Sequence, residues 1–260
     1  MTIANFDPLL ITPAFLAGAL VLSTHVPLGH EVLKRGIIFI DIAIAQIAAL
    51  GVIAVTTFGG ELAAWQIQIF AGISAISGAA LIHWLERSYA SILEALIGLL
   101  FILAASGGLL LASFSANSEQ LLHDLLVGQI LWVSNQQLSW VAALYAPLLL
   151  IWFAIDCSKK PILFYIIFSL AITASVQLVG IYLVFASLIL PALASQHIAL
   201  VKNKLLVSYL VGLAGYLTGL LVSIQFDLPT GAITVWTLLV VVLIARPIIK
   251  HYFVTPVLAV

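Results

Sequence analysis

Charged side chains are scarce in this sequence of 260 residues: they account for 7% of it, while 64% is hydrophobic. Soluble domains carry about 25% charged residues. The scarcity, with a mean hydropathy of +1.26, excludes a soluble globular protein. The first basic residue is Lys34, so no positive region precedes the first apolar segment. We therefore expect that segment to stay in the membrane as a span and not to be cleaved as a signal peptide.

Two kinds of chemistry are also missing from the sequence. Cys157 is the single cysteine, which excludes an internal disulfide and a thiolate metal cluster. No G-x-x-x-x-G-K-[ST] stretch occurs, so the chain has no phosphate-binding loop for ATP. The net charge of -1 gives no indication of nucleic acid, and we expect none as a partner.

Long apolar runs predict an all-α integral membrane protein with about eight or nine transmembrane helices, forming one permease-sized domain over residues 1–260. The run 162–194 is too long for one span, so we expect helix breaks at Val179-Gly180 and at Pro191. Segment 121–134 is too short to cross comfortably, and we expect it to be re-entrant or interfacial. The expected spans are 9–24, 37–57, 63–84, 92–114, 138–155, 162–178, 181–194, 205–225 and 231–246.

The basic residues predict the orientation of this layout. All nine fall on one face, which the positive-inside rule makes cytoplasmic. The N-terminus is then outside and the C-terminus cytoplasmic. Small residues spaced four apart predict close helix packing, and they are Ala71/Ala75/Ala79, Ser74/Gly78 and Gly215/Gly219.

Asp41 and Gln46 interrupt one of the most apolar spans. Each costs several kcal/mol in hydrocarbon unless it faces protein, water or an ion. Asp41 is either part of a transport pathway or an interfacial carboxylate paired with Lys34 or Arg35. Five helical positions turn by about 140°, so the two side chains share a face only if a π-bulge lies between them.

Other polar residues are weaker candidates for a role in transport. Like Asp41, Glu94 is either part of a transport pathway or an interfacial carboxylate. His25, His30 and Glu31 lie in a stretch that we expect to be a solvated cytoplasmic loop, although three ligands in seven residues could bind a divalent ion. On the outer side, His123 and Asp124 could capture a first-row divalent metal.

The segment after Pro191 predicts a short amphipathic cytoplasmic helix over about 194–203. Its apolar face has nothing in its own chain to bury it, which favours a protein partner. The alternative is a helix that lies in the membrane interface. The residues concerned are Ala194, Ser195, Gln196, His197, Ile198, Ala199, Leu200 and Val201.

Five stretches, in order along the chain, resemble the permease subunits of metal-ion (zinc, manganese, iron) ABC importers. They are HVPLGHEVLKRGIIFIDIAIAQIAALG, LEALIGLLFILAASGGLLLAS, LLHDLLVGQILWVS, VQLVGIYLVFASLILPALAS and FDLPTGAITV.

The resemblance implies two permeases paired in the inner membrane, a cytoplasmic ABC ATPase docked on residues of about 194–203, and an external binding protein that delivers the metal. The metal is then cargo, with no permanently bound cofactor and no catalysis by this chain. Asp41 matches the family's aspartate, but Gln46 stands where the family has histidine, one position further along. A second family histidine falls at Ile102. Fewer nitrogen ligands suit manganese or ferrous iron somewhat better than zinc. The alternative is a secondary cation transporter that uses Asp41 and Glu94.

Overall fold

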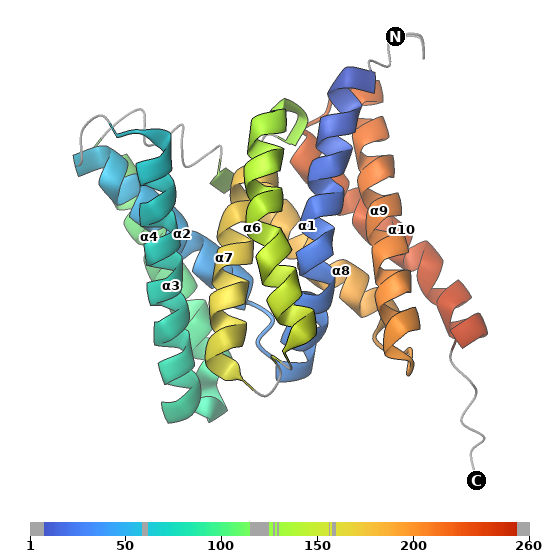
Figure 1. Ribbon diagram of the computed structural model, residues 1–260, viewed down its shortest axis with the longest axis horizontal. Helices are drawn as coiled ribbons and strands as arrows, with labels where there is room; N and C mark the ends of the chain where they lie inside the picture. Colours follow the sequence, from blue (N-terminus) through green and yellow to red (C-terminus); the bar gives the residue numbers. More distant parts are fainter. Residues whose placement is uncertain are drawn as a thin grey trace.

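The computed structural model describes residues 8–58, 62–114, 125, 126, 128, 130–155, 157 and 160–253, and Figure 1 shows them as a bundle of helices. Two short 3-10 helices, η2 and η3, accompany the α-helices. The elements are α1 (Pro8–Arg35), α2 (Ile40–Phe58), α3 (Ala64–Ser88), η2 (Ala90–Ile92), α4 (Leu93–Ala112), η3 (Ile130–Trp132), α6 (Asn135–Ala154), α7 (Pro161–Val179), α8 (Ile181–Ser195), α9 (Val201–Phe226) and α10 (Thr230–Phe253).

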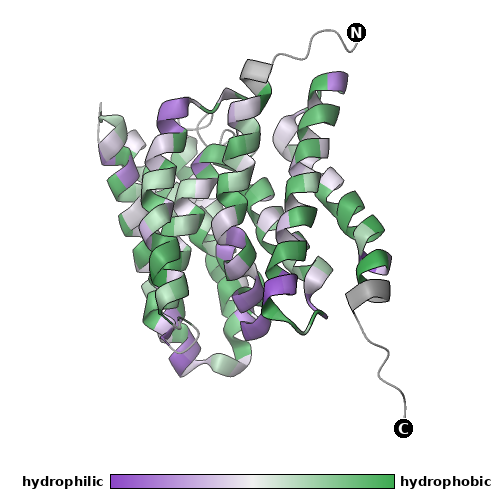
Figure 2. Cartoon of the chain, turned by 45° about the vertical axis from the view of Figure 1, so that its right-hand side comes forward, coloured by the Kyte–Doolittle hydropathy of each residue, from purple (hydrophilic) through white to green (hydrophobic). Residues whose placement is uncertain are grey.

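The lengths and hydropathies of these helices make the chain a multi-pass membrane protein. Within the described residues, eight helices are long and apolar enough to cross a membrane, and α8 is shorter, with 15 residues. Figure 2 shows long hydrophobic stretches along the helices and hydrophilic segments mainly near their ends. The predicted all-α polytopic bundle is therefore confirmed.

Successive described α-helices, the shorter α8 included, run in opposite directions through the bundle (Figure 1), and α4 finishes at the end where α6 starts. This is the arrangement expected without a span over 121–134. The basic residues then gather near the end where α1 finishes. Those at described positions are Lys34, Arg35, Arg87, Lys160, Lys202, Lys204, Arg246 and Lys250.

α1 is longer than expected, because the predicted loop from His25 to Glu31 is helical. His25 is fully buried, and its Nδ1 lies 2.9 Å from the Val21 carbonyl oxygen and its Nε2 3.2 Å from Ser175 Oγ. Glu31 accepts a 2.8 Å hydrogen bond from Arg35 Nε. These partners satisfy polar groups that would otherwise favour a solvated loop, so the loop prediction was wrong.

The predicted close packing at small residues is confirmed. Ala71, Ala75 and Ala79 are buried on α3. On α9, a Cβ added to Gly215 would lie 2.4 Å from the Leu238 side chain, and one added to Gly219 would lie 2.7 Å from Thr234 Cα on α10. The absence of side chains at these two glycines lets α9 and α10 approach closely.

The connection between α7 and α8 is a single residue, Gly180, whose φ of 81° is readily adopted only by glycine. Gly128, with φ 74°, packs directly on this junction: a Cβ there would lie 2.3 Å from the Val179 carbonyl carbon. α8 continues through Pro191 to Ser195, so the break expected at Pro191 is absent. A proline costs a membrane helix one backbone donor, which neighbouring groups can compensate.

The helix expected over 194–203 is interrupted. α8 ends at Ser195, residues 196–200 form a turn, and α9 begins at Val201. Ile198 is buried within the turn and belongs to a small core with α9 and α10. Ser195 Oγ lies 2.7 Å from Ser208 Oγ, which also lies 3.0 Å from His30 Nε2 on α1. These contacts hold the turn against the bundle.

Candidate functional site

The two polar residues of α2 lie in different surroundings. α2 is α-helical throughout, from Ile40 to Phe58, so the π-bulge that would have brought Asp41 and Gln46 onto one face is absent. In a regular helix the five-residue separation turns the side chains about 140° apart. Gln46 instead shares its face with Ile42, one turn earlier, and both line a cavity.

Asp41 is enclosed at the start of α2, with 1% of its surface exposed. Its carboxylate lies near the backbone amides of Asp41 and Ile42, where the positive end of the helix dipole favours an acid. No side chain of the residues placed in the structure hydrogen-bonds to either carboxylate oxygen.

If Asp41 were an interfacial carboxylate, as the alternative interpretation holds, it would need Lys34 or Arg35 as a basic partner. Lys34 and Arg35 instead pair with Glu31, and Arg35 also reaches Glu86. No ion pair to Asp41 occurs within the described part of the chain. Asp41 is therefore buried without the basic partner that this interpretation required.

Glu94 joins the starts of two helices. Its Oε1 accepts a 3.2 Å hydrogen bond from the Phe39 backbone N–H, just before α2. Its Oε2 is buried with no hydrogen-bond partner in the described ranges. Glu94 therefore positions the beginning of α2 beside α4.

A cavity of about 480 Å³ lies beside Gln46. Helices α2, α4, α8 and α10 contribute to its wall, together with residue 126. Apart from Gln46 and the Tyr182 hydroxyl, the lining side chains are apolar. They are Ile42, Gln46, Phe101, Ala105, Leu109, Leu126, Ile181, Tyr182, Phe185 and Val235.

A second cavity, of about 350 Å³, lies at the opposite end of α3 from Arg87. Three carboxamides border it, from Gln68 on α3, Gln137 on α6 and Gln177 on α7. The Gln68 amide donates a hydrogen bond to Gln177 Oε1. Sequence reasoning missed this cluster, because its one visible sign is a glutamine near the N-terminal end of α3, another near that of α6 and a third near the C-terminal end of α7.

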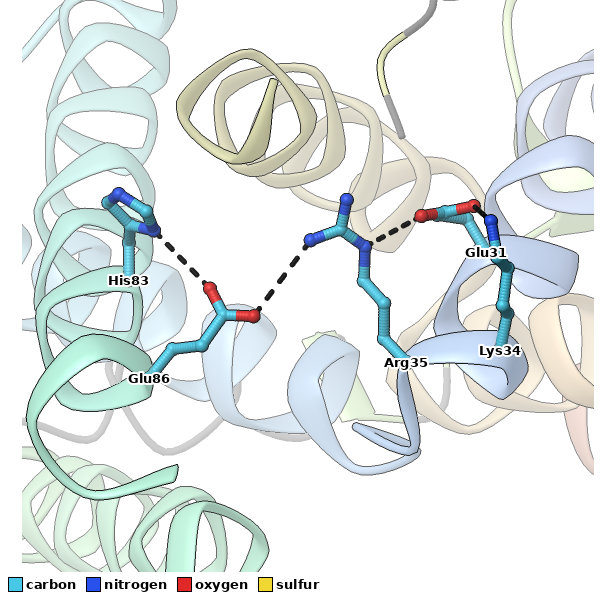
Figure 3. Close-up of polar contacts among 5 residues, drawn as sticks. All are labelled: Glu31, Lys34, Arg35, His83 and Glu86. Atoms are coloured by element: carbon cyan, nitrogen blue, oxygen red, sulfur yellow. Dashed lines mark hydrogen bonds and ion pairs between the residues drawn. The ribbon is translucent and has the colours of Figure 1, made fainter. Parts of the chain in front are cut away.

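An ion network joins α1 to α3 near the end where the basic residues gather (Figure 3). Arg35 lies between two acids, with Nε 2.8 Å from Glu31 and Nη1 3.9 Å from Glu86. Its guanidinium also stacks over the Phe164 ring of α7, 4.3 Å from the centroid. His83 Nδ1 lies 3.4 Å from Glu86.

His83 extends this contact to α7, because its ring lies 5.3 Å from that of Tyr165. α3 and α7 therefore touch near both ends, at His83–Tyr165 and at Gln68–Gln177.

A closed metal site is not present among the residues that the structure describes, since no three His, Cys, Asp or Glu side chains there gather closely enough to hold an ion. His25 and His30 bond to serines instead. His123 and Asp124 lie outside the described residues, so their capture role stays a prediction. Ile102, at the position of the family's second histidine, is exposed on α4.

The fold and the buried polar groups define a class: a polytopic helical membrane permease. The family model described as the ABC 3 transport family matches residues 8–160 and 153–248. The chain belongs to this family, and the resemblance to metal-ion ABC permeases is confirmed. It is accordingly a membrane subunit of an ABC transporter.

Similar proteins agree with this assignment. The chain is 26% identical over 243 residues to the uncharacterized membrane protein slr2045 of Synechocystis sp., covering 84% of this chain and 85% of that one. Its fold matches that of PsaBC from Streptococcus pneumoniae, solved in complex with a Fab, with a TM-score of 0.74 and 22% identity. The match covers 95% of this chain and 96% of that one. It also matches the inward-facing conformation of a structure described as a putative metal-chelate type ABC transporter, with a TM-score of 0.62 and 16% identity. This match covers 96% of this chain and 90% of that one.

Proposed function

We propose that this chain is the permease of an ABC importer that moves a divalent transition metal (zinc, manganese or iron) into the cytoplasm. The observation that carries the proposal is the buried carboxylate of Asp41 on α2, which pairs with no side chain of the described residues, in a member of the ABC 3 transport family. Metal transport gives that carboxylate a cation to meet during the cycle. Gln46, about 8 Å further along the helix axis, faces the neighbouring cavity as a neutral oxygen donor.

The orientation and partners of the complex follow from the same proposal. The end with the basic residues is cytoplasmic by the positive-inside rule, which places the N-terminus outside and the C-terminus inside the inner (plasma) membrane. A second copy of this chain completes the membrane part as a homodimer, a separate ABC ATPase supplies hydrolysis, and an external solute-binding protein delivers cargo near His123 and Asp124.

The ATPase contact lies at the connection between α8 and α9. Leu200 and Val201 are each 67% exposed there, while Ile198 is buried. Two apolar side chains that project from a turn held to α1 and α9 provide a firm, exposed contact for a partner. We therefore keep residues 194–201 as the segment that contacts the ATPase, and call it the coupling segment. It is a turn flanked by the end of α8 and the start of α9.

Uptake into vesicles that hold the permease, its ATPase and its binding protein tests the proposal. We expect ⁶⁵Zn or ⁵⁴Mn uptake to require ATP, and Asp41→Asn to lower it at least about tenfold, equivalent to about 1.4 kcal/mol. The matched control is Glu94→Gln, which keeps an oxygen acceptor for the Phe39 N–H. We expect Glu94→Gln to retain uptake within about twofold, because Glu94 positions a helix. Uptake that needs no ATP and is lost in both variants would establish the secondary-transporter alternative.

Co-purification of the ATPase with tagged permease tests the coupling segment. Leu200→Asp places a charge in the proposed contact, and we expect it to remove most of the bound ATPase. Ile92→Asp is the matched control, since Ile92 is 52% exposed in η2 at the same end of the bundle. Equal ATPase recovery with both variants would rule out Leu200 as part of the contact.

A further inference from the structure

A hydrogen-bond network holds the coupling segment to α1. Ser195 at the end of α8 and Ser208 on α9 lie on the two sides of the turn, both are fully buried, and their Oγ atoms are 2.7 Å apart. His30 Nε2 on α1 lies 3.0 Å from Ser208 Oγ and 3.3 Å from Ser195 Oγ. One histidine of α1 therefore contacts both sides of the turn.

The surroundings of Ser208 indicate which way its bond to His30 runs. The Ser208 hydroxyl donates to the main chain, where the carbonyl oxygens of Pro191 and Lys204 each lie 3.0 Å away. Its lone pairs are then left to accept, and the N–H at His30 Nε2 donates to them. A hydrogen bond fixes distance and direction, whereas apolar burial is non-directional. A displacement of the turn therefore acts directly on His30.

α1 and α8 touch backbone to backbone one residue before His30. A Cβ added to Gly29 would lie 2.1 Å from the Leu188 carbonyl oxygen. The absence of a side chain at Gly29 lets the two helices approach this closely. Because α8 and the two serines hold α1 at the same level, α1 follows the turn and does not slide past it.

α1 also leads from His30 to the carboxylate of the proposed pathway. The helix ends five residues beyond His30, about 8 Å further along its axis, and residues 36–39 connect it to α2. Phe39, the last of these, stacks on Phe185 of α8 at a centroid separation of 6.2 Å. Asp41 lies in the first turn of α2. A continuous series of contacts therefore joins the coupling segment to Asp41.

From these contacts we infer that His30 transmits the movement of the coupling segment to α1 and, through α1, to the start of α2. His30 is a positioning residue, because it acts through the two serines while the cargo meets Asp41. The inference rests on the proposed import function and adds the residue by which movement of the ATPase reaches the pathway. It also gives a use to three polar side chains at a place where apolar packing, such as that of Ile198, already holds the turn.

The ratio of metal uptake to ATP hydrolysis tests the inference, in vesicles that hold the permease, its ATPase and its binding protein. The measured quantity is the ⁶⁵Zn or ⁵⁴Mn taken up per ATP hydrolysed. His30→Leu keeps much of the side-chain volume without the donor, and we expect it to lower this ratio about tenfold. Bound ATPase and hydrolysis should stay within about twofold. His30→Gln places an amide N–H near the position of Nε2 and should keep the ratio within about twofold.

Two further variants separate transmission from stability. Tyr209→Phe removes another bond between α9 and α1, the 3.0 Å bond from the Tyr209 hydroxyl to the Ser23 carbonyl oxygen, and it should leave the ratio unchanged. Ser208→Ala removes the acceptor with little change in volume and should lower the ratio as His30→Leu does. In the double variant the two losses should not add, because both act through one bond.

An unchanged ratio in His30→Leu and Ser208→Ala would overturn the inference, as would an equal fall in Tyr209→Phe or no rescue by His30→Gln. If His30→Leu does not assemble with the ATPase, the ratio measured for Ser208→Ala decides. In each of these cases ATP-dependent uptake by the unmodified complex would still support metal import. Uptake by the unmodified complex that needs no ATP would overturn the import proposal, and this inference with it.

Discussion

Gly128→Ala is expected to destabilise the protein by about 2–5 kcal/mol. A left-handed backbone costs a non-glycine residue about 1–2 kcal/mol, and Gly128 has a φ of 74°. The new Cβ would also lie 2.3 Å from the Val179 carbonyl carbon and oxygen and 2.5 Å from the Gly180 nitrogen. These are backbone atoms, so no side chain can rotate away, and overpacking adds about 1–3 kcal/mol.

The matched control is Gly36→Ala. Gly36 has nearly the same φ, 69°, but nothing lies within 4 Å of its added Cβ. We expect this variant to show the backbone cost alone, about 1–2 kcal/mol. Unfolding of both variants in detergent micelles, followed by tryptophan fluorescence, measures the difference. Equal losses of stability would mean that Gly128 does not pack on the junction between α7 and α8.

Arg35→Ala is expected to cost about 3 kcal/mol of stability. Its guanidinium, with 13% of the side chain exposed, lies between Glu31 and Glu86 and over the Phe164 ring. Removing it leaves the largely buried Glu31 carboxylate without its closest cation, and breaking a buried pair from one side costs about 3–5 kcal/mol. The partial exposure of Glu86 places the expected value at the lower end.

Lys34→Ala is the matched control for Arg35→Ala, because both residues pair with Glu31. The Lys34 side chain is 70% exposed and its nitrogen lies 3.8 Å from the carboxylate. Surface pairs contribute about 0–1 kcal/mol, so this variant should unfold almost like the unmodified chain. If the two variants lose the same stability in the unfolding assay, charge on α1 matters and the enclosed geometry of Arg35 does not.

Hydropathy alone was enough to predict the helical bundle, because lipid requires long apolar helices with every backbone bond satisfied internally. The course of α1 could not be predicted in this way. Its polar residues find partners far along the chain, as His25 does with Ser175 and His30 with Ser208. Without those contacts, a stretch with Pro27, Gly29 and two histidines is typical of a loop.

The candidate site was partly predictable, for a similar reason. Asp41 and Gln46 stand out because polar groups are costly in hydrocarbon, but the cavity beside Gln46 does not stand out. Most of its lining residues are apolar side chains of α4, α8 and α10, which look the same in sequence whether they face a cavity, a neighbouring helix or lipid. Which helices meet at Gln46 depends on the tertiary packing, and no local sequence pattern indicates it.

The paired contacts between α3 and α7 have a mechanical consequence. Gln68–Gln177 and His83–Tyr165 are separated by 15 residues of α3, about 22 Å along its axis. A tilt of one helix against the other must stretch one of these two contacts. Any movement that preserves both contacts carries α3 and α7 together as one rigid unit, so a tilt of α3 is accompanied by the same tilt of α7.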